Sequence, residues 1–188
     1  MTTMESESDV PQHIAASAPR DRFGRIARLL HWLMAVLIVT MLFLGAALVG
    51  TIGNYGLLLS LHKTIGIAIL VLAVLRLVNR VRRSALPRSS LRGVERFVAG
   101  GSEALMYLLF LAQPLVGWAL VSASGAPIEL FGGIYLPAIA PADAHLYAEL
   151  RTLHSWLAYA LLAVFTAHMC AVLAHASILR DGLLRRML

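Results

Sequence analysis

The sequence has little of two things that soluble domains of its length usually contain. It has one cysteine, Cys170, and only 14% of its 188 residues are charged. A lone cysteine excludes an intrachain disulfide and the CxxCH motif that attaches a c-type haem. With 59% hydrophobic residues and a mean hydropathy of +0.77, the chain is too apolar for a soluble domain, so we expect a membrane protein.

The N-terminal segment lacks the features of a cleaved signal peptide. Its first 28 residues are polar, first acidic and then basic, and the apolar run that follows is long enough to remain as a span. We expect residues 1–22 to form a disordered polar tail and residues 23–188 to form a single transmembrane domain.

Four apolar runs are long enough for the roughly 20 residues that cross a bilayer as a helix. The runs are Leu29–Gly50, Tyr55–Leu75, Ala104–Ala123 and Thr152–Leu179, and the only charged residue within them is Lys63. The chain is therefore predicted to be all-α, a transmembrane four-helix bundle with both termini on one side. The fourth run is overlong, with 28 residues, and should tilt or project beyond the membrane.

Basic residues predict the orientation, because short cytoplasmic segments collect Lys and Arg. Of the 16 basic residues, 14 lie on the side of the termini and 2 lie near the opposite face. The first group is Arg20, Arg22, Arg25, Arg28, Arg76, Arg80, Arg82, Arg83, Arg88, Arg92, Arg96, Arg180, Arg185 and Arg186; the second is Lys63 and Arg151. We expect both termini in the cytoplasm. The net charge of +6 then reflects contact with anionic lipid headgroups rather than with nucleic acid.

The three connections between the runs differ in character. Thr51–Asn54 is predicted to be a tight turn, and Ser84–Gly101 a basic inner loop. Ser124–Arg151 is longer and holds apolar and aromatic residues between prolines, so we expect this loop to pack over the outer end of the bundle.

Histidines inside the runs point to a function, because an imidazole in hydrocarbon needs a partner. In the fourth run His154, His168 and His175 are separated by steps of 14 and 7 residues, which return to nearly the same face of a helix. His154 and His168 would lie about 21 Å apart along the axis, one near each membrane face. This spacing is typical of two stacked cofactor sites.

His154 and His168 can each be paired with a histidine that would lie at the same depth in the membrane. His62, at the outer end of the second run, matches His154, and His31, at the inner end of the first run, matches His168. Two neutral imidazoles from facing helices are how a bundle holds the iron of a non-covalent b-type haem. One histidine alone could instead be an interhelical hydrogen-bonding residue. Four at matched depths favour two haems.

Glycines recur where a flat macrocycle would need room. Gly45 lies 14 residues after His31, Gly66 lies one turn after His62, and Gly117 lies in the third run beside Pro114. Glycine would let a haem approach the backbone, but it also marks close contacts between helices. The glycines alone do not distinguish a haem site from a close contact between helices.

Several charged and polar residues could support the two sites. Arg76 repeats the 14-residue step from His62, and it would reach the inner level and pair with a haem propionate. The alternative partners for that propionate are Arg25 and Arg28. Gln113, beside Pro114, is interpreted first as part of a helix kink and only second as a cofactor contact.

His175 has three interpretations. It could be a snorkelling interfacial residue, a substitute haem ligand, or a hydrogen-bonding partner of a quinone near the inner haem. His13 and His145 lie outside the runs and are expected to be solvated.

The chain resembles the bacterial cytochrome b561 family of di-haem, four-helix membrane proteins. The resemblance runs from Phe23 to Leu188 and is carried by RLLHWLMAVL, LHKTIGIAILVLAVLRLVNR, YLLFLAQPLVGW and LHSWLAYALLAVFTAHMCAVLAH. It implies an inner-membrane location, the ligand positions His31, His62, His154 and His168, and electron exchange with the ubiquinone pool.

Similar members of that family include the superoxide oxidase, which oxidises superoxide on the periplasmic side and reduces ubiquinone. The resemblance thus implies an oxidoreductase whose one-electron donor is superoxide, with Lys63 and Arg151 as the charges that would steer the anion. Nearby acidic residues, Glu129, Asp143 and Glu149, could cancel that field. Two alternatives stay open: a cytochrome b subunit that links a partner dehydrogenase or hydrogenase to quinone, and a haem-free transporter or scaffold.

Overall fold

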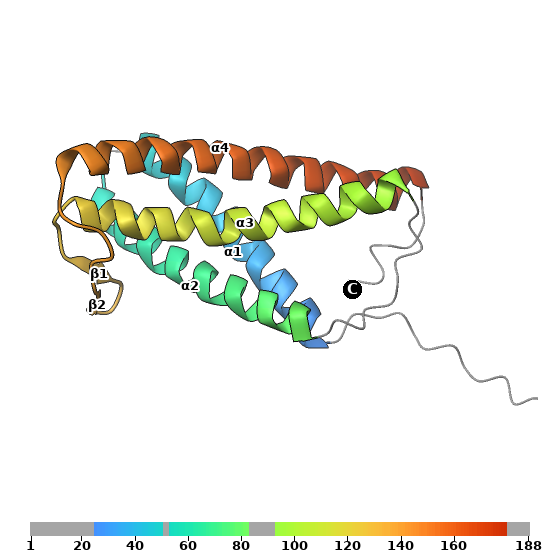
Figure 1. The fold of residues 1–188 in the computed structure, drawn as a ribbon, viewed down its shortest axis with the longest axis horizontal. Coiled ribbons are helices and arrows are strands. Elements are labelled where there is room, and N and C mark those ends of the chain that lie inside the picture. The colour runs from blue at the N-terminus through green and yellow to red at the C-terminus, as the bar shows by residue number, and fades with distance from the viewer. Residues whose placement is uncertain (1–24, 51–52, 83–92, 180–188) are drawn as a thin grey trace, which may run out of the picture.

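The computed structural model describes residues 25–50, 53–82 and 93–179. It contains four long helices, α1 (Arg25–Gly50), α2 (Tyr55–Arg82), α3 (Val94–Ala123) and α4 (Ala144–Ala174), and α4 continues into a π-helical turn, η1 (His175–Leu179). A short hairpin of β1 (Ile128–Leu130) and β2 (Ile134–Leu136) follows α3 and precedes α4 in the chain, and it lies at one end of the bundle (Figure 1). The predicted all-α four-helix bundle is confirmed. The predicted N-terminal tail, residues 1–22, lies outside the described residues.

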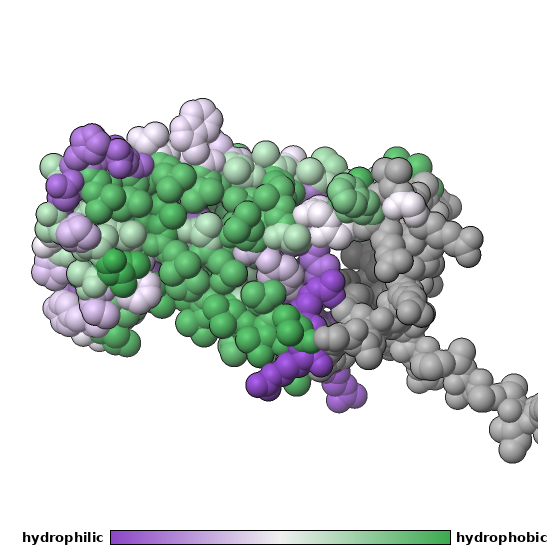
Figure 2. Space-filling view, in the orientation of Figure 1, coloured by the Kyte–Doolittle hydropathy of each residue, from purple (hydrophilic) through white to green (hydrophobic). Residues whose placement is uncertain are grey.

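All four helices are long and apolar enough to cross a membrane. A helix satisfies its backbone donors and acceptors internally, which hydrocarbon requires. Large apolar side chains remain on the outside of the bundle, such as Phe43 at 73% exposure and Val49 at 92%. Figure 2 shows hydrophobic side chains over the long middle of the bundle and hydrophilic ones toward its ends. This surface suits lipid acyl chains, so the chain is a multi-pass membrane protein.

The helices alternate in direction and pack in chain order, α1 on α2, α2 on α3 and α3 on α4. We call the end of the bundle that carries β1 and β2 the hairpin end, and the opposite end, where α1 begins and α2 finishes at Arg80 and Arg82, the arginine end (Figure 1). Arg25 and the end of η1 both lie at the arginine end.

All four helices extend beyond the apolar runs that predicted them, and the difference is largest at the starts of α3 and α4. Helix α3 begins at Val94, inside the predicted inner loop Ser84–Gly101, and α4 begins at Ala144, inside the predicted outer loop Ser124–Arg151. Asp143 caps α4 by accepting a hydrogen bond from the Leu146 backbone N–H at 2.7 Å. Hydropathy marks only the part of a helix that lies in hydrocarbon, so these polar first turns were wrongly predicted as loop.

The outer connection packs over the hairpin end, as predicted, but it contains an unpredicted antiparallel hairpin. Its register pairs Ile128 with Leu136 and Leu130 with Ile134. Gly132 and Gly133 turn the chain with φ angles of 90° and 78°, a region that favours glycine. Ile128 and Leu130 are buried, and β1 lies against α2.

Two helix hydroxyls hold this connection in the same way. Thr64 of α2 donates to the Ser60 carbonyl at 2.8 Å and accepts from the Phe131 N–H at 2.8 Å. Ser122 of α3, which is 3% exposed, donates to the Trp118 carbonyl at 2.9 Å and accepts from the Ile139 N–H at 3.1 Å. Each hydroxyl thus joins a spanning helix to the connection. The hairpin is a fixed cover over the hairpin end.

Replacing Thr64 with valine should loosen that cover while keeping the size of the side chain. The Phe131 N–H would lose its acceptor, which costs about 1 kcal/mol. We expect hydrogen exchange at the Phe131 amide to rise roughly fivefold in the detergent-solubilised protein. Thr64→Ser keeps the hydroxyl and serves as the control. Equal exchange in Thr64→Val and the parent protein would contradict this role for Thr64.

Candidate functional site

A pair of histidines from α2 and α4 meets near the hairpin end. The ring centroids of His62 and His154 lie 6.2 Å apart, with 70° between the ring planes. These residues are 92 positions apart in the sequence, and they meet because α2 and α4 run through the same level of the bundle. The structure therefore brings together the two residues that the sequence placed at the outer level.

Gln113 of α3 is the polar residue that contacts His154. Its amide nitrogen donates to the His154 backbone carbonyl at 3.2 Å and lies 3.3 Å from the Nε2 atom of the His154 ring. The first interpretation of Gln113, as part of a kink at Pro114, missed this contact. No local pattern could have revealed it, because Gln113 and His154 lie on different helices and 41 residues apart.

Glycines leave room for both imidazoles. A Cβ atom on Gly117 would lie 3.0 Å from Cε1 of His154, and one on Gly45 would lie 3.9 Å from Cε1 of His62. Gly66 instead faces Met41, whose Cε would lie 3.4 Å from an added Cβ. Gly117 is therefore the tightest of the three positions. Only Gly117 and Gly45 adjoin a histidine of this pair.

The hairpin-end site contains three buried polar atoms without a hydrogen-bonding partner: Nδ1 of His62, Nδ1 of His154 and Oε1 of Gln113. Unpaired buried groups are costly, so a cluster of them marks a place where a further group binds. The helices that carry this pair, α2 and α4, are not among the closely packed helix pairs of the described residues. The two rings approach each other across a wider separation of backbones.

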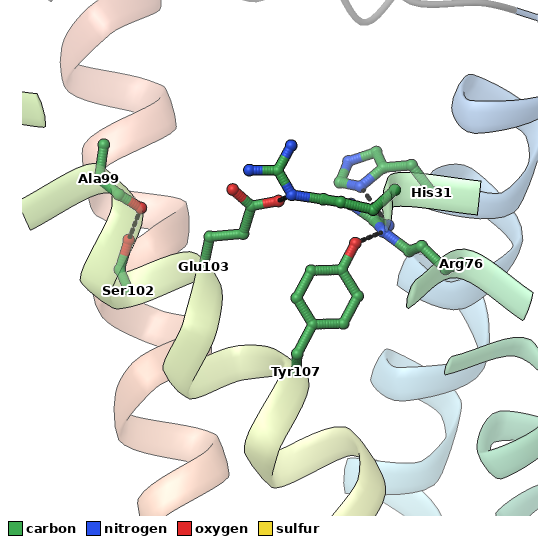
Figure 3. A network of polar contacts seen from close by, with 7 residues as sticks. His31, Arg76, Ala99, Ser102, Glu103 and Tyr107 are labelled. Carbon is green, nitrogen blue, oxygen red and sulfur yellow. Dashed lines mark hydrogen bonds and ion pairs between the residues drawn. The ribbon is translucent and has the colours of Figure 1, made fainter. Parts of the chain in front are cut away.

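A second site lies toward the arginine end, around His31 of α1. Arg76 of α2 donates from Nη1 to Nδ1 of His31 at 2.9 Å and from Nε to the Tyr107 hydroxyl of α3 at 3.1 Å (Figure 3). Its guanidinium carbon lies 5.8 Å from the centre of the Tyr107 ring. His168 of α4, the predicted partner of His31, is half-buried. The contacts at this site join side chains of α1, α2 and α3.

An ion pair borders this second site. Arg80 of α2 and Glu103 of α3 are 2.8 Å apart, and Figure 3 shows Glu103 beside the Tyr107 and Arg76 contacts. Sequence reasoning missed Glu103 and Tyr107. A signal was present, since Arg76 and Arg80 are four residues apart and so are Glu103 and Tyr107, which places each pair on one face of its helix.

The remaining candidate residues are more scattered. Lys63 is half-buried and Arg151 is exposed near the hairpin end. His175 begins the π-helical turn η1, a feature that often occurs at functional sites. Arg25 and Arg28 lie in the first turn of α1. His145 is exposed, as expected, and its ring lies 3.3 Å from Glu149.

Known proteins are similar to this chain over most of its length. The family model described as prokaryotic cytochrome b561 matches residues 22–188. The chain belongs to this family. It is thus a membrane electron-transfer protein, and the resemblance drawn from the histidine motifs is confirmed. The family typically carries haem b.

Individual relatives agree with this assignment. The chain is 34% identical over 173 residues to cytochrome b561 homolog 2 of Escherichia coli K12, covering 89% of this chain and 92% of the relative. It is 28% identical to cytochrome b561 homolog 1 of the same organism, covering 89% and 97%. It is also 32% identical over 131 residues to the probable superoxide oxidase CybB of Yersinia pestis, covering 68% and 73%.

The donor set suits haem better than a metal ion held by protein ligands alone. Within residues 25–50, 53–82 and 93–179, no three His, Cys, Asp or Glu side chains gather to hold a metal ion. Haem iron needs only one or two axial ligands from the protein, whereas a bare metal ion such as zinc takes three or four. A pair of histidines fits the first requirement.

The tight fit at Gly117 predicts the effect of adding one methyl group. Alanine in place of a helical glycine normally stabilises by roughly 0.5–1 kcal/mol. At Gly117 the new Cβ would press on the His154 ring, and overpacking costs about 1–3 kcal/mol. We expect Gly117→Ala to lower the thermal unfolding temperature in detergent. Gly101→Ala, on the same helix with open space around it, is the control, and equal stability of both variants would refute the crowding.

Proposed function

We propose that this cytochrome holds two non-covalent b-type haems and carries electrons from a one-electron donor at the hairpin end to ubiquinone. His62 and His154 would hold the iron of one haem, and His31 and His168 that of the other. The 6.2 Å between the His62 and His154 ring centres supports the proposal most directly. Two imidazoles that face each other in the core of a helix bundle are a ligand set that haem iron would accept.

The unpaired atoms fit the same group. An imidazole that gives one nitrogen to iron usually donates its other N–H to an acceptor. The unpaired oxygen of Gln113 is such an acceptor, and it is buried in the same site as the unpaired nitrogens of His62 and His154. Haem, when bound, supplies an iron that takes up and releases one electron.

The chain's own residues would orient and insulate the two sites. Gln113 fixes the His154 backbone and ring, Gly117 lets the ring lie against α3, and the hairpin covers the end of the bundle. At the arginine end, Arg76 contacts both His31 and Tyr107. A neutral imidazole has one lone pair, so Arg76 would release the His31 ring when iron binds there and would stay beside the site through Tyr107. We assign Arg76 the further role of pairing with a haem propionate. His175 is our candidate for hydrogen bonding to the quinone.

Superoxide is the donor that we favour. One relative is named as a probable superoxide oxidase, and Lys63 and Arg151 lie near the hairpin end, where positive charge would attract an anion. Each superoxide would lose one electron to become O₂. Two such electrons and two protons would convert one ubiquinone to ubiquinol.

The charge distribution supports an orientation. We propose that the arginine end faces the cytoplasm and the hairpin end faces the periplasm of a bacterial inner membrane. Arg25, Arg28, Arg80 and Arg82 lie at the first end, which follows the bias of basic residues toward the cytoplasm.

The two-haem assignment predicts a definite stoichiometry. Purified protein should show reduced b-type alpha absorption and a haem-to-protein ratio near two, measured as the pyridine haemochrome. Replacing His62 or His154 with alanine should remove one haem, and replacing His31 or His168 should remove the other, because each iron would lose an axial ligand.

Exposed His145 provides the control, since His145→Ala should retain both haems. A parent protein without b-type absorption, or with a ratio near one, would overturn the proposal.

Superoxide steering is tested separately from haem binding. Replacing Lys63 and Arg151 together with glutamine should slow superoxide oxidation severalfold and flatten its dependence on ionic strength, because steering by charge is screened by salt. The measurement is ubiquinone reduction by generated superoxide at several salt concentrations. Unchanged kinetics would exclude this role, and retained haem absorption shows that the variant is intact.

A further inference from the structure

The two histidine pairs differ in the charge of the group that contacts them. At the hairpin end the contacting side chain is the neutral amide of Gln113, 3.3 Å from the His154 ring. Toward the arginine end it is the guanidinium of Arg76, 2.9 Å from the His31 ring. Arginine is always protonated in proteins. One site therefore has a fixed positive charge against its histidine and the other does not.

The protein contacts of Arg76 do not cancel its charge, so replacing Arg76 removes one positive charge from the site whether or not a haem propionate pairs with it. It donates to the Tyr107 hydroxyl and to His31, and both partners are neutral. The adjacent carboxylate, Glu103, is engaged by a second cation, Arg80, at 2.8 Å. The Arg76, Arg80 and Glu103 cluster thus carries a net charge of +1. Because Arg76 is only partly exposed, water and salt screen it incompletely.

Among the described residues, no hydrogen bond joins Lys63 or Arg151 to His62 or His154, whereas one joins Arg76 to His31. Lys63 follows His62 directly, and successive residues are turned by about 100° around a helix. The two side chains therefore leave α2 in different directions. Arg151 precedes His154 by three residues but is exposed, so solvent screens its charge.

We infer that Arg76 makes the arginine-end site the better electron acceptor of the two by raising its potential. This inference rests on the proposed two-haem function and adds an order of the two potentials to it. A positive charge stabilises the reduced form of a nearby redox centre, because reduction adds one negative charge there. An electron that enters from superoxide at the hairpin end is therefore drawn to the arginine end, where ubiquinone accepts it.

The size of the effect is large enough to measure. A unit charge about 12 Å away, at an effective dielectric constant of about 20, shifts an equilibrium by roughly tenfold, and a closer charge shifts it further. The charge on Arg76 would thus shift a single electron toward the arginine end.

The experiment is an optical redox titration of the haem-loaded protein in lipid nanodiscs. Arg76→Gln keeps the length and hydrogen-bonding ability of the side chain but removes its charge, and Arg76→Lys keeps the charge. We expect Arg76→Gln to lower the midpoint potential of the arginine-end haem, with a shift of roughly tenfold in the electron distribution between the two haems. Arg76→Lys should retain most of the parent value. The hairpin-end haem is the internal control and should not move.

Single-haem variants assign the two potentials. His154→Ala should leave the arginine-end haem and His31→Ala the hairpin-end haem, so each component of the titration can be identified. The inference would be overturned if Arg76→Gln left both midpoint potentials unchanged or lowered both by the same amount. In that outcome two bound haems would still uphold the proposed function, whereas absence of the haems would contradict the function itself.

A second variant tests the same charge from the opposite side. Glu103→Gln removes a negative charge beside Arg80 and should raise the potential of the arginine-end haem without affecting the other haem. This prediction decides the matter if Arg76→Gln fails to fold or to retain haem. An unchanged or lowered arginine-end potential in Glu103→Gln would refute the electrostatic role of the cluster.

Discussion

The structure depends on one constraint, which is that polar side chains inside hydrocarbon must find partners within the bundle. Backbone groups meet this requirement by forming helices, but His62, His154 and Gln113 keep unpaired atoms even after the helices have packed. The His154 ring lies against α3, which explains why a small residue, Gly117, stands at that point. Unpaired buried atoms are costly, so a site of this kind favours a further bound group, which is the physical link between this fold and the cofactor that we propose.

The same constraint shapes the two ends of the bundle differently. At the hairpin end, neutral contacts surround the histidine pair, and the Thr64 and Ser122 hydroxyls hold a cover over it. At the arginine end, guanidinium groups enter the bundle and one of them contacts His31 directly. Donors and acceptors would meet different environments at the two ends. A bundle that looks symmetric in its histidines is therefore asymmetric in charge.

Much of this arrangement could be predicted from the sequence. Apolar runs indicated four helices, and the 14-residue step from His154 to His168 indicated two levels. Helix ends were less predictable, because the polar first turns of α3 and α4 are helical without being hydrophobic. The β1 and β2 hairpin was also missed, since its strands are only three residues long. The haem-ligand assignment of the four histidines remains a prediction.

The sequence by itself determined the membrane class, the number of spans and the heights of the histidines, because hydropathy and helical periodicity are local properties that act along one chain segment. Only the tertiary structure decided which side chains touch those histidines. Gln113 reaches His154 across 41 residues and Arg76 reaches His31 across 45. Such contacts depend on how the helices are rotated and packed against one another, and the periodicity of a single helix contains no information about its neighbours.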